Sequence, residues 1–393
     1  MFQRKPGKRL ILNDDSGCFA SICEAIRGMV MMKIAVIGAG ETGKRYVQHL
    51  LNAGQTEIAG VYDTQLEAAS ALAQRCGCPA FPSMEALDAA LPRDTVYNCL
   101  GLPEDSQMPY LFRALAGGRQ VIARMPAADS VEDVQALLEA AEAHGGRLLF
   151  SHPERFYYHN IDLKHRIEAG SIGRIGTINV KRYLPLRPTA FRQDESGASG
   201  VHWMGGNYSC AGEPKDGALF GLALHDIDLL RWTLGEVANV YAMHTASGES
   251  DYVLVTLKFR QGSIANIEAY RGYPGGYTAA VEYAGSKGVI RYDNRKTNAL
   301  QIHKTENSAS WPHNTQFSPS FRHPELDELV HLLSCLRNGS QPMMTVEDVR
   351  ETLKVVHAAQ QSIRTGQPVQ LGVDRVNGIP GFHGEANGGG EHA

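Results

Sequence analysis

The sequence predicts an α/β domain built on a doubly wound parallel sheet, followed by an α+β domain with a large, mostly antiparallel, open sheet. Short apolar runs alternate with helical patterns up to about residue 152. Strand-like stretches then gather into a block with few helices between residues 177 and 283. The length of 393 residues suits two to three domains of about 100–200 residues each.

The composition excludes some classes of binding partner and indicates the cellular compartment. The chain is 43% apolar and 20% charged, and its formal net charge is −4. This balance gives no basic footprint for nucleic acid, and no apolar run is long enough to span a membrane. Seven scattered cysteines favour a reducing, cytoplasmic setting over a disulfide framework. Cys76 and Cys78 have no second pair to complete a zinc site, and the sequence predicts no metal centre.

We divide the chain into four parts. Residues 1–30 precede Met31 and Met32, which stand directly before the first strand, and we expect them to lie outside the fold. The first domain covers residues 31–152 and the second covers residues 153–371. Residues 372–393 are rich in Gly, Asn and His without apolar periodicity, and we expect a disordered tail.

The first strand, at residues 34–37, leads into a glycine-rich loop of the form GxGxxG. Gly38 allows the tight turn, Gly40 lets backbone amides approach a pyrophosphate, and Gly43 lets the following helix pack close to the strand. Glu41 and Thr42 open that helix, whose N-terminus attracts phosphate. The loop therefore predicts a dinucleotide site of the Rossmann type.

Asp63 predicts which dinucleotide binds. A second strand, at residues 57–62, ends at Asp63, twenty residues after Gly43. A carboxylate at this position accepts hydrogen bonds from the ribose hydroxyls and repels a 2′-phosphate. The sequence therefore predicts NAD, with NADP less favoured.

The remaining elements of the first domain continue the alternation. Because ligands bind at the carboxyl ends of parallel strands, the loop Gly101–Pro103 after the third strand is expected beside the cofactor, with Gly101 and Pro103 in contact with it. The expected helices are 65–75, 110–115 and 130–143, and the expected strands are 95–100, 120–123 and 147–151.

The second domain has a different order of predicted strands and helices. Its strand-like stretches fall at residues 177–182, 237–245, 252–259, 263–270 and 280–283, and its helices at 161–169, 224–234, 326–336 and 346–363. Strands grouped in this way favour an antiparallel sheet. The segment 184–214 is long, polar and rich in Gly and Pro, which is typical of a functional loop.

Five motifs together resemble the Gfo/Idh/MocA family of nicotinamide-dependent oxidoreductases. They are AVIGAGETG at 35–43, HPERF at 152–156, EAGSIGRIG at 168–176, GALFGLALHDIDLLRWTLGE at 217–236 and RNGSQPMMTVEDV at 337–349. The resemblance runs from Met32 to Leu371. It implies NAD-dependent hydride transfer to or from a small polyol, sugar or related carbonyl or imine.

The chain departs from both catalytic signatures that the resemblance implies. The family's Glu-Lys-Pro is replaced by Arg124, Met125 and Pro126, so the lysine that hydrogen-bonds the reacting oxygen is absent. Pro126 is still expected beside the cofactor. In the second signature Gly221 stands for an aspartate, while His225 and Asp228 remain. His225 is the expected proton-transfer group, with Asp228 orienting it.

Weaker candidates for substrate contact come from three places. His152 follows the last parallel strand, and Lys181 and Tyr183 share one face of a later strand. His202 and Tyr208 belong to the long polar loop.

Two functions are left open by these residues. The first is an active oxidoreductase with an atypical site; the second is a cofactor-binding homologue without catalysis, acting as a sensor or assembly partner. The open sheet needs its exposed face covered, so a homodimer or homotetramer is expected.

Overall fold

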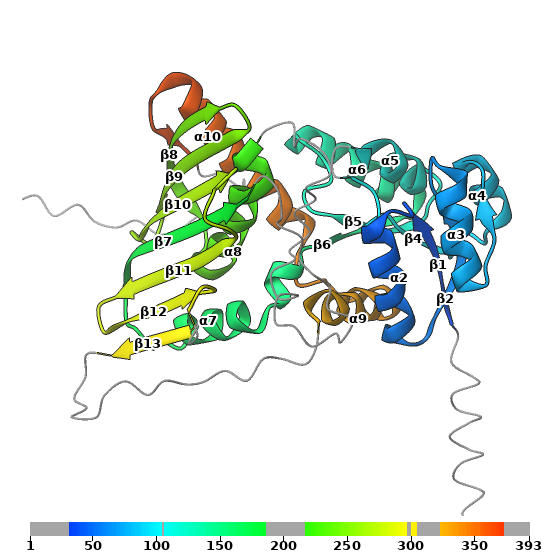
Figure 1. Ribbon diagram of the computed structural model, residues 1–393, viewed down its shortest axis with the longest axis horizontal. Helices are drawn as coiled ribbons and strands as arrows, with labels where there is room; N and C mark the ends of the chain where they lie inside the picture. The colour runs from blue at the N-terminus through cyan, green and yellow to red at the C-terminus, as the bar shows by residue number, and fades with distance from the viewer. Residues whose placement is uncertain (1–30, 104–105, 186–216, 297–299, 305–322, 373–393) are drawn as a thin grey trace, which may run out of the picture.

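The computed structural model describes residues 31–103, 106–185, 217–296, 300–304 and 323–372. Two sheets stand side by side, each covered by helices (Figure 1). The predicted segments 1–30 and 373–393, and most of the loop 184–214, lie outside the described residues. In the described part, no helix is both long and apolar enough to cross a membrane.

The first sheet is a six-stranded parallel sheet in the order β3-β2-β1-β4-β5-β6. Its central strands are buried β-branched runs, as expected for a sheet covered on both faces. The strands are β1 (Met32–Ile37), β2 (Thr56–Tyr62), β3 (Ala80–Phe81), β4 (Val96–Asn98), β5 (Gln120–Arg124) and β6 (Arg147–Ser151). The helices between them are α2 (Glu41–Ala53), α3 (Leu66–Cys76), α4 (Met84–Ala90), α5 (Met108–Ala116) and α6 (Val131–His144).

The second sheet has eight strands in the order β13-β12-β11-β7-β10-β9-β8-β14. Every neighbouring pair is antiparallel except β7 with β10. The strands are β7 (Ile175–Leu184), β8 (Val237–Ser247), β9 (Ser250–Phe259), β10 (Ile264–Arg271), β11 (Thr278–Gly285), β12 (Gly288–Asp293), β13 (Leu300–Lys304) and β14 (Val369–Gln370). This sheet and the parallel one confirm the predicted fold class.

Helices cover one face of the second sheet. They are η2 (Pro153–Phe156), α7 (Tyr158–Glu168), the π-helical turn η4 (Leu219–Ala223) that leads into α8 (Leu224–Leu234), and α10 (Val346–Thr365). Apolar residues of α8 and α10 join those of β7 to β10 in one continuous core that reaches into the first domain. The opposite face of the sheet carries exposed apolar side chains, including Met243 and Ile264.

Helix α9 (Pro324–Asn338) returns to the first sheet although it follows the second along the chain. Leu329, Leu332 and Leu333 of α9 share a buried cluster with residues of α2, β1 and β6, and Figure 1 shows α9 beside α2. Side chains from late in the chain therefore reach the end of β6.

Most predicted elements agree with the structure to within a few residues. The sequence analysis missed β3, α4, β12, β13 and β14. Most of these are short or lie near a sheet edge, where local apolar periodicity is weak.

Candidate active site

Three glycines shape the cofactor loop by close backbone approach. Gly38 has a φ of 95°, which favours glycine. A Cβ on Gly43 or Gly101 would overlap the carbonyl oxygen of Gly38, and one on Gly38 would overlap Gly101. Nothing lies within 4 Å of a Cβ built on Gly40, so that position opens onto free space. This cradle fits a pyrophosphate at the start of α2.

Asp63 ends β2 and joins the two loops at this edge. Its carboxylate accepts hydrogen bonds from the amides of Ala39 at 2.6 Å and Gln65 at 2.9 Å. The carboxylate is thus held where a ribose is expected, which fits NAD.

Removing the Asp63 carboxylate should change cofactor preference. We expect Asp63→Ala to weaken NADH binding and to narrow the preference for NADH over NADPH, because both the ribose contact and the repulsion of a 2′-phosphate are lost. Fluorescence titration with each cofactor measures this. Asp63→Asn is the matched control, since it keeps the shape and loses the charge. Tighter binding of NADPH than NADH by the unaltered protein would contradict the assignment.

The other cofactor candidates lie at the same edge of the sheet. Glu41 is exposed and paired with Lys44 at 2.6 Å, and Thr42 lies in the first turn of α2. Gly101 and Pro103 follow β4, and Pro126 is buried after a cis peptide bond at the end of β5. Their contact with cofactor stays a prediction.

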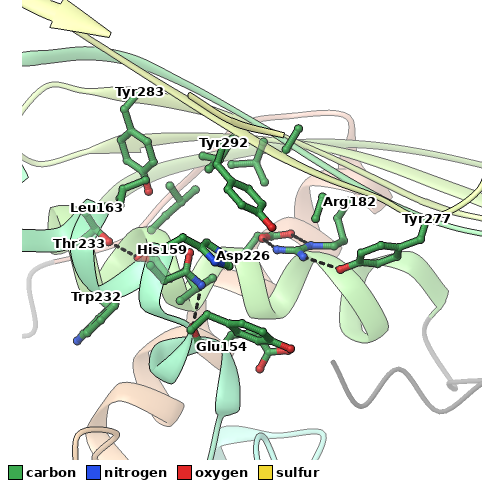
Figure 2. Close-up of a pocket in the computed structure, with 18 residues that line it drawn as sticks. Glu154, His159, Leu163, Arg182, Asp226, Trp232, Thr233, Tyr277, Tyr283 and Tyr292 are labelled. Carbon is green, nitrogen blue, oxygen red and sulfur yellow. Dashed lines mark hydrogen bonds and ion pairs between the residues drawn. The ribbon is translucent and has the colours of Figure 1, made fainter. Parts of the chain in front are cut away.

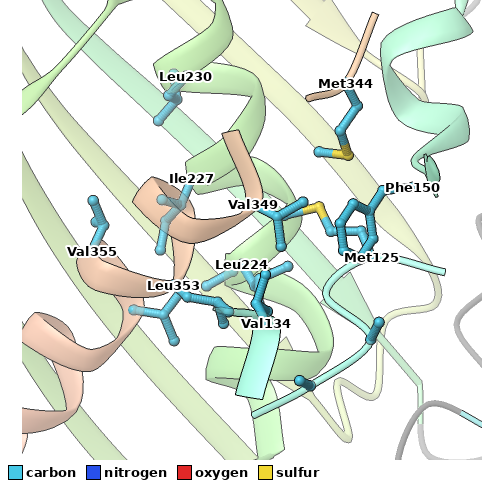
Figure 3. Close-up of a cluster of buried hydrophobic side chains, with 14 of the residues drawn as sticks. Met125, Val134, Phe150, Leu224, Ile227, Leu230, Met344, Val349, Leu353 and Val355 are labelled. Carbon is cyan, nitrogen blue, oxygen red and sulfur yellow. The ribbon is translucent and has the colours of Figure 1, made fainter. Parts of the chain in front are cut away.

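Met125 is buried among apolar side chains at the end of β5. Its exposed fraction is 0%, and Figure 3 shows it beside Phe150 and Val349. The neighbouring Arg124 is also buried and donates a hydrogen bond to the carbonyl of Leu100 at 2.9 Å. Arg124 is thus engaged with the loop that follows β4.

A lysine at position 125 should destabilise the protein. We expect Met125→Lys to lower the free energy of unfolding by several kcal/mol, because the cluster offers no carboxylate to an ammonium group taken out of water. Guanidinium unfolding measures the loss. Met125→Leu, which conserves volume, should cost under about 1.5 kcal/mol. A fully stable lysine variant would show that the side chain reaches solvent or an acid.

His152 and His225 lie side by side where the two domains meet. His152 follows β6 and is 1% exposed, while His225 lies in the first turn of α8 and is 9% exposed. Their ring centres are 5.2 Å apart and the rings are tilted by 32°. Nδ1 of His152 is 2.9 Å from Glu154, and its Nε2 is 3.1 Å from Asp228.

Asp228 has a different partner from the one predicted. The sequence analysis expected it to orient His225, but both of its oxygens accept hydrogen bonds from Arg155, at 2.8 and 2.7 Å. Thr352 also donates to it, at 3.3 Å. A planar guanidinium matches a carboxylate in two places, which explains why Arg155 takes this position. Asp228 therefore orients His152 and Arg155.

Burial and neighbouring charge separate the two histidines electrostatically. Burial lowers the pKa of His225 to about 4; Glu154 opposes this shift and His152 adds to it. Burial also disfavours the cation of His152, but Asp228 and Glu154 outweigh it and raise the pKa of His152 to about 9. At neutral pH His225 is therefore neutral and His152 is a cation.

This charge pattern predicts a loss of stability at alkaline pH. A pKa of His152 raised to about 9 stabilises the fold below about pH 6.5, and the contribution disappears as pH rises through 9. Burial raises the pKa of Glu328 to about 8, which acts in the same direction. We expect the free energy of unfolding to fall by a few kcal/mol from pH 6.5 to 9. Unfolding curves at several pH values measure this, and a flat profile would contradict it.

A cavity of about 60 Å³ lies beside this pair, between α7, α8 and the second sheet. Figure 2 shows its polar groups: Arg182 binds Asp226 at 2.6 and 3.1 Å and donates to the Tyr277 hydroxyl at 3.0 Å. The ring of His159 stacks on Tyr292, with ring centres 4.1 Å apart. Glu154 lines the cavity as well as contacting His152, so it connects the two.

Lys181 and Tyr183 face away from this cavity. They share one face of β7, as predicted, but Val180 and Arg182 are the residues that line the cavity. Because side chains alternate along a strand, Lys181 and Tyr183 turn to the opposite face, where both meet Glu268. They therefore do not line this cavity, and their contact with substrate stays a prediction. His202 and Tyr208 lie outside the described residues.

Position 221 carries no polar side chain, and several polar residues around His225 were not predicted from the sequence. Gly221 falls in η4 and supplies no carboxylate. Sequence reasoning missed Glu154, Arg155, Arg182, Asp226 and Tyr277. Glu154 and Arg155 belong to the motif HPERF, and Asp226 belongs to the motif at 217–236, so these motifs were the available signals.

The fold and the site define a class: a nicotinamide-dependent oxidoreductase with a Rossmann domain and a second, sheet-based domain. Residues 32–152 match the family described as "Oxidoreductase family, NAD-binding Rossmann fold", and residues 164–371 match its "C-terminal alpha/beta domain". The chain belongs to this family, the Gfo/Idh/MocA oxidoreductases. The match confirms the predicted family and the predicted cofactor NAD.

Relatives and solved structures agree with this assignment. The scyllo-inositol 2-dehydrogenase (NAD(+)) of Bacillus subtilis is 26% identical over 283 residues, which cover 70% of this chain and 77% of that protein. The inositol 2-dehydrogenase of Rhizobium meliloti is 22% identical over 350 residues, covering 86% and 99%. The WlbA dehydrogenase of Bordetella pertussis, solved with NADH and UDP-GlcNAcA, shares the fold with a TM-score of 0.71 at 22% identity, covering 87% and 98%.

Proposed function

We propose that this protein transfers a hydride between NAD and a small polyol- or sugar-like carbonyl or imine compound, with His225 as the proton-transfer group. The observation that carries the proposal is the placement of His225. It lies beside His152, at the carboxyl end of β6, on the sheet edge that also holds the Gly38 cradle and Asp63. The inositol dehydrogenases among the relatives support the substrate class.

Different residues of the chain bind the cofactor and transfer the proton. The glycine cradle and Asp63 bind and orient the cofactor, which supplies or accepts the hydride when bound. His225 is neutral at pH 7, so it can accept the hydroxyl proton when an alcohol is oxidised. The buried surroundings keep most of the water away from its ring, which is 9% exposed.

A substrate panel tests this proposal. The purified protein should reduce NAD⁺ with at least one inositol or sugar, or oxidise NADH with a matching carbonyl or imine, followed by NADH absorbance. Turnover with NADH binding intact supports the proposal. Tight NADH binding without turnover of any compound in either direction would contradict it.

The alternative function is cofactor binding without catalysis. It is favoured by the two vacant polar positions, since Met125 is buried in an apolar cluster and Gly221 offers no side chain. The same panel separates the two functions. Direct binding of NADH does not, because both require it.

We also propose that the protein is a cytoplasmic homodimer or homotetramer paired through the open face of the second sheet. Met243 and Ile264 on that face are 49% and 43% exposed, and covering them would bury apolar surface. Light scattering on the purified chain tests the assembly, and a monomer at micromolar concentration would contradict it.

A further inference from the structure

His152 occupies an unusual position for a histidine beside a reaction centre. Its two ring nitrogens lie 2.9 Å from Glu154 and 3.1 Å from Asp228, so a carboxylate stands at each end of the ring. With an exposed fraction of 1%, the ring is almost fully buried, and both of its nitrogens face carboxylates.

The clamp around His152 is itself held in place by a rigid frame. Arg155 binds both oxygens of Asp228 and also donates to the carbonyl of Met343 at 2.8 Å. On the other side, the backbone amide of His152 donates to Glu328 of α9. Elements from three parts of the chain thus fix the ring.

His225 lies against the open face of this fixed ring. Its ring centre is 5.2 Å from that of His152, and the two rings are tilted by 32°. At this separation in a buried site, a charge on one ring acts strongly on the other, because little water screens it.

From this geometry we propose that His152 is a positioning residue: clamped between Glu154 and Asp228, it orients the His225 ring and supplies a fixed positive charge that, together with burial, opposes protonation of His225. This assignment rests on the proposed function of His225. It explains why a site without the family's lysine keeps a buried cation near the reaction centre.

Other titratable groups pack around the pair, and the balance of those that are charged determines the sign of the effect. They are Glu154 and Arg155 of η2, Asp226 and Asp228 of α8, Arg182 of β7, Glu328 of α9 and Asp348 of α10. Burial, His152 and Arg182 oppose a charge on His225, while Glu154 and Asp226 favour it. Removing the charge of His152 therefore takes away one of the groups that keep the pKa of His225 low.

Titration of His225 in the full-length protein tests the proposal without any substrate. We expect His152→Gln to raise the pKa of His225 by at least about one pH unit. The reason is that a neighbouring charge at this range shifts a pKa by about 1–3 units. The measurement is the NMR shift of isotope-labelled histidine rings, with the His225 signal identified by its loss in His225→Gln. His152→Asn is a second neutral variant, for use if the glutamine variant does not fold.

Two further variants separate charge from packing. His152→Lys keeps a cation between the carboxylates and should hold the pKa of His225 near its original value. His159→Gln is the matched control, because His159 is a second histidine near the site that stacks on Tyr292 rather than on His225. It should leave His225 unchanged.

The outcomes distinguish this proposal from the proposed function. An unchanged His225 titration in both neutral variants would reduce His152 to a packing role and overturn the proposal. A shifted titration in a protein that turns over no substrate would uphold the electrostatic arrangement and contradict only the proposed function. In an active protein, the neutral variants should also move the acid limb of the kcat/KM profile upward in pH, with little change in cofactor affinity.

Discussion

Replacing His225 by alanine should lower kcat by about 10²–10⁴-fold, while the affinity for NADH changes little. The physical reason is that Met125 and Gly221 offer no proton-transfer group, so the proposed function gives this role to His225, which lies beside His152. Steady-state kinetics with the best substrate of the panel, together with NADH titration, measure the two effects separately.

The pH dependence of activity provides a second readout of the same residue. From the sequence, an inflection near neutrality is expected for a histidine. The structure corrects this, because burial lowers the pKa of His225 to about 4. Oxidation of an alcohol should therefore show its acid limb near pH 4 and stay flat through neutrality, as far as His225 controls it.

The matched control for His225 is His159→Ala, which removes another histidine from the surroundings of the cavity. It should leave kcat within a few-fold of the original value. If His225→Ala keeps near-normal kcat, proton transfer belongs to another group, and Glu154 and Tyr277 become the next candidates.

Replacing Asp228 by alanine should lower the free energy of unfolding by about 3–5 kcal/mol. The substitution leaves Arg155 without its two-point partner and His152 without one of its carboxylates, both in a buried environment. The loss is a large part of the 5–15 kcal/mol that stabilises a typical protein. Guanidinium unfolding measures the shift in midpoint.

An exposed carboxylate that also pairs with an arginine provides the control. Glu347 pairs with Arg350 at 2.8 Å on the surface of α10, with 61% of its side chain exposed. Glu347→Ala should change stability by under about 1 kcal/mol. Equal effects of the two substitutions would show that Asp228 is not held in a buried ion pair.

Much of the candidate site could be predicted because its signals are local. The GxGxxG loop follows a strand directly, and Asp63 ends the next strand, so a short window of sequence contains the whole cofactor signature. Parallel strands then bring their carboxyl ends to one edge, which places the loop after β4 and His152 near the same ligand.

The partners of the charged residues could not be predicted in this way. Arg155 and Asp228 are 73 positions apart, and His152 and Glu328 are 176 apart. Asp228 is close to His225 in sequence, which predicts that the two are partners. In the structure, the guanidinium of Arg155, from another element, donates to both oxygens of Asp228. Likewise, local alternation predicted that Lys181 and Tyr183 share a face, but only the packing of α8 against β7 showed which face lines the cavity.

The sequence by itself determined the two-domain fold class, the NAD-binding loop and the family, because periodicity and short motifs encode these features locally. The tertiary structure alone decided that Met125 is buried, that His152 is clamped between Glu154 and Asp228, and that α9 closes the first domain. These features depend on which distant side chains meet in a medium with little water, and pairing at that range leaves no periodic trace in the sequence.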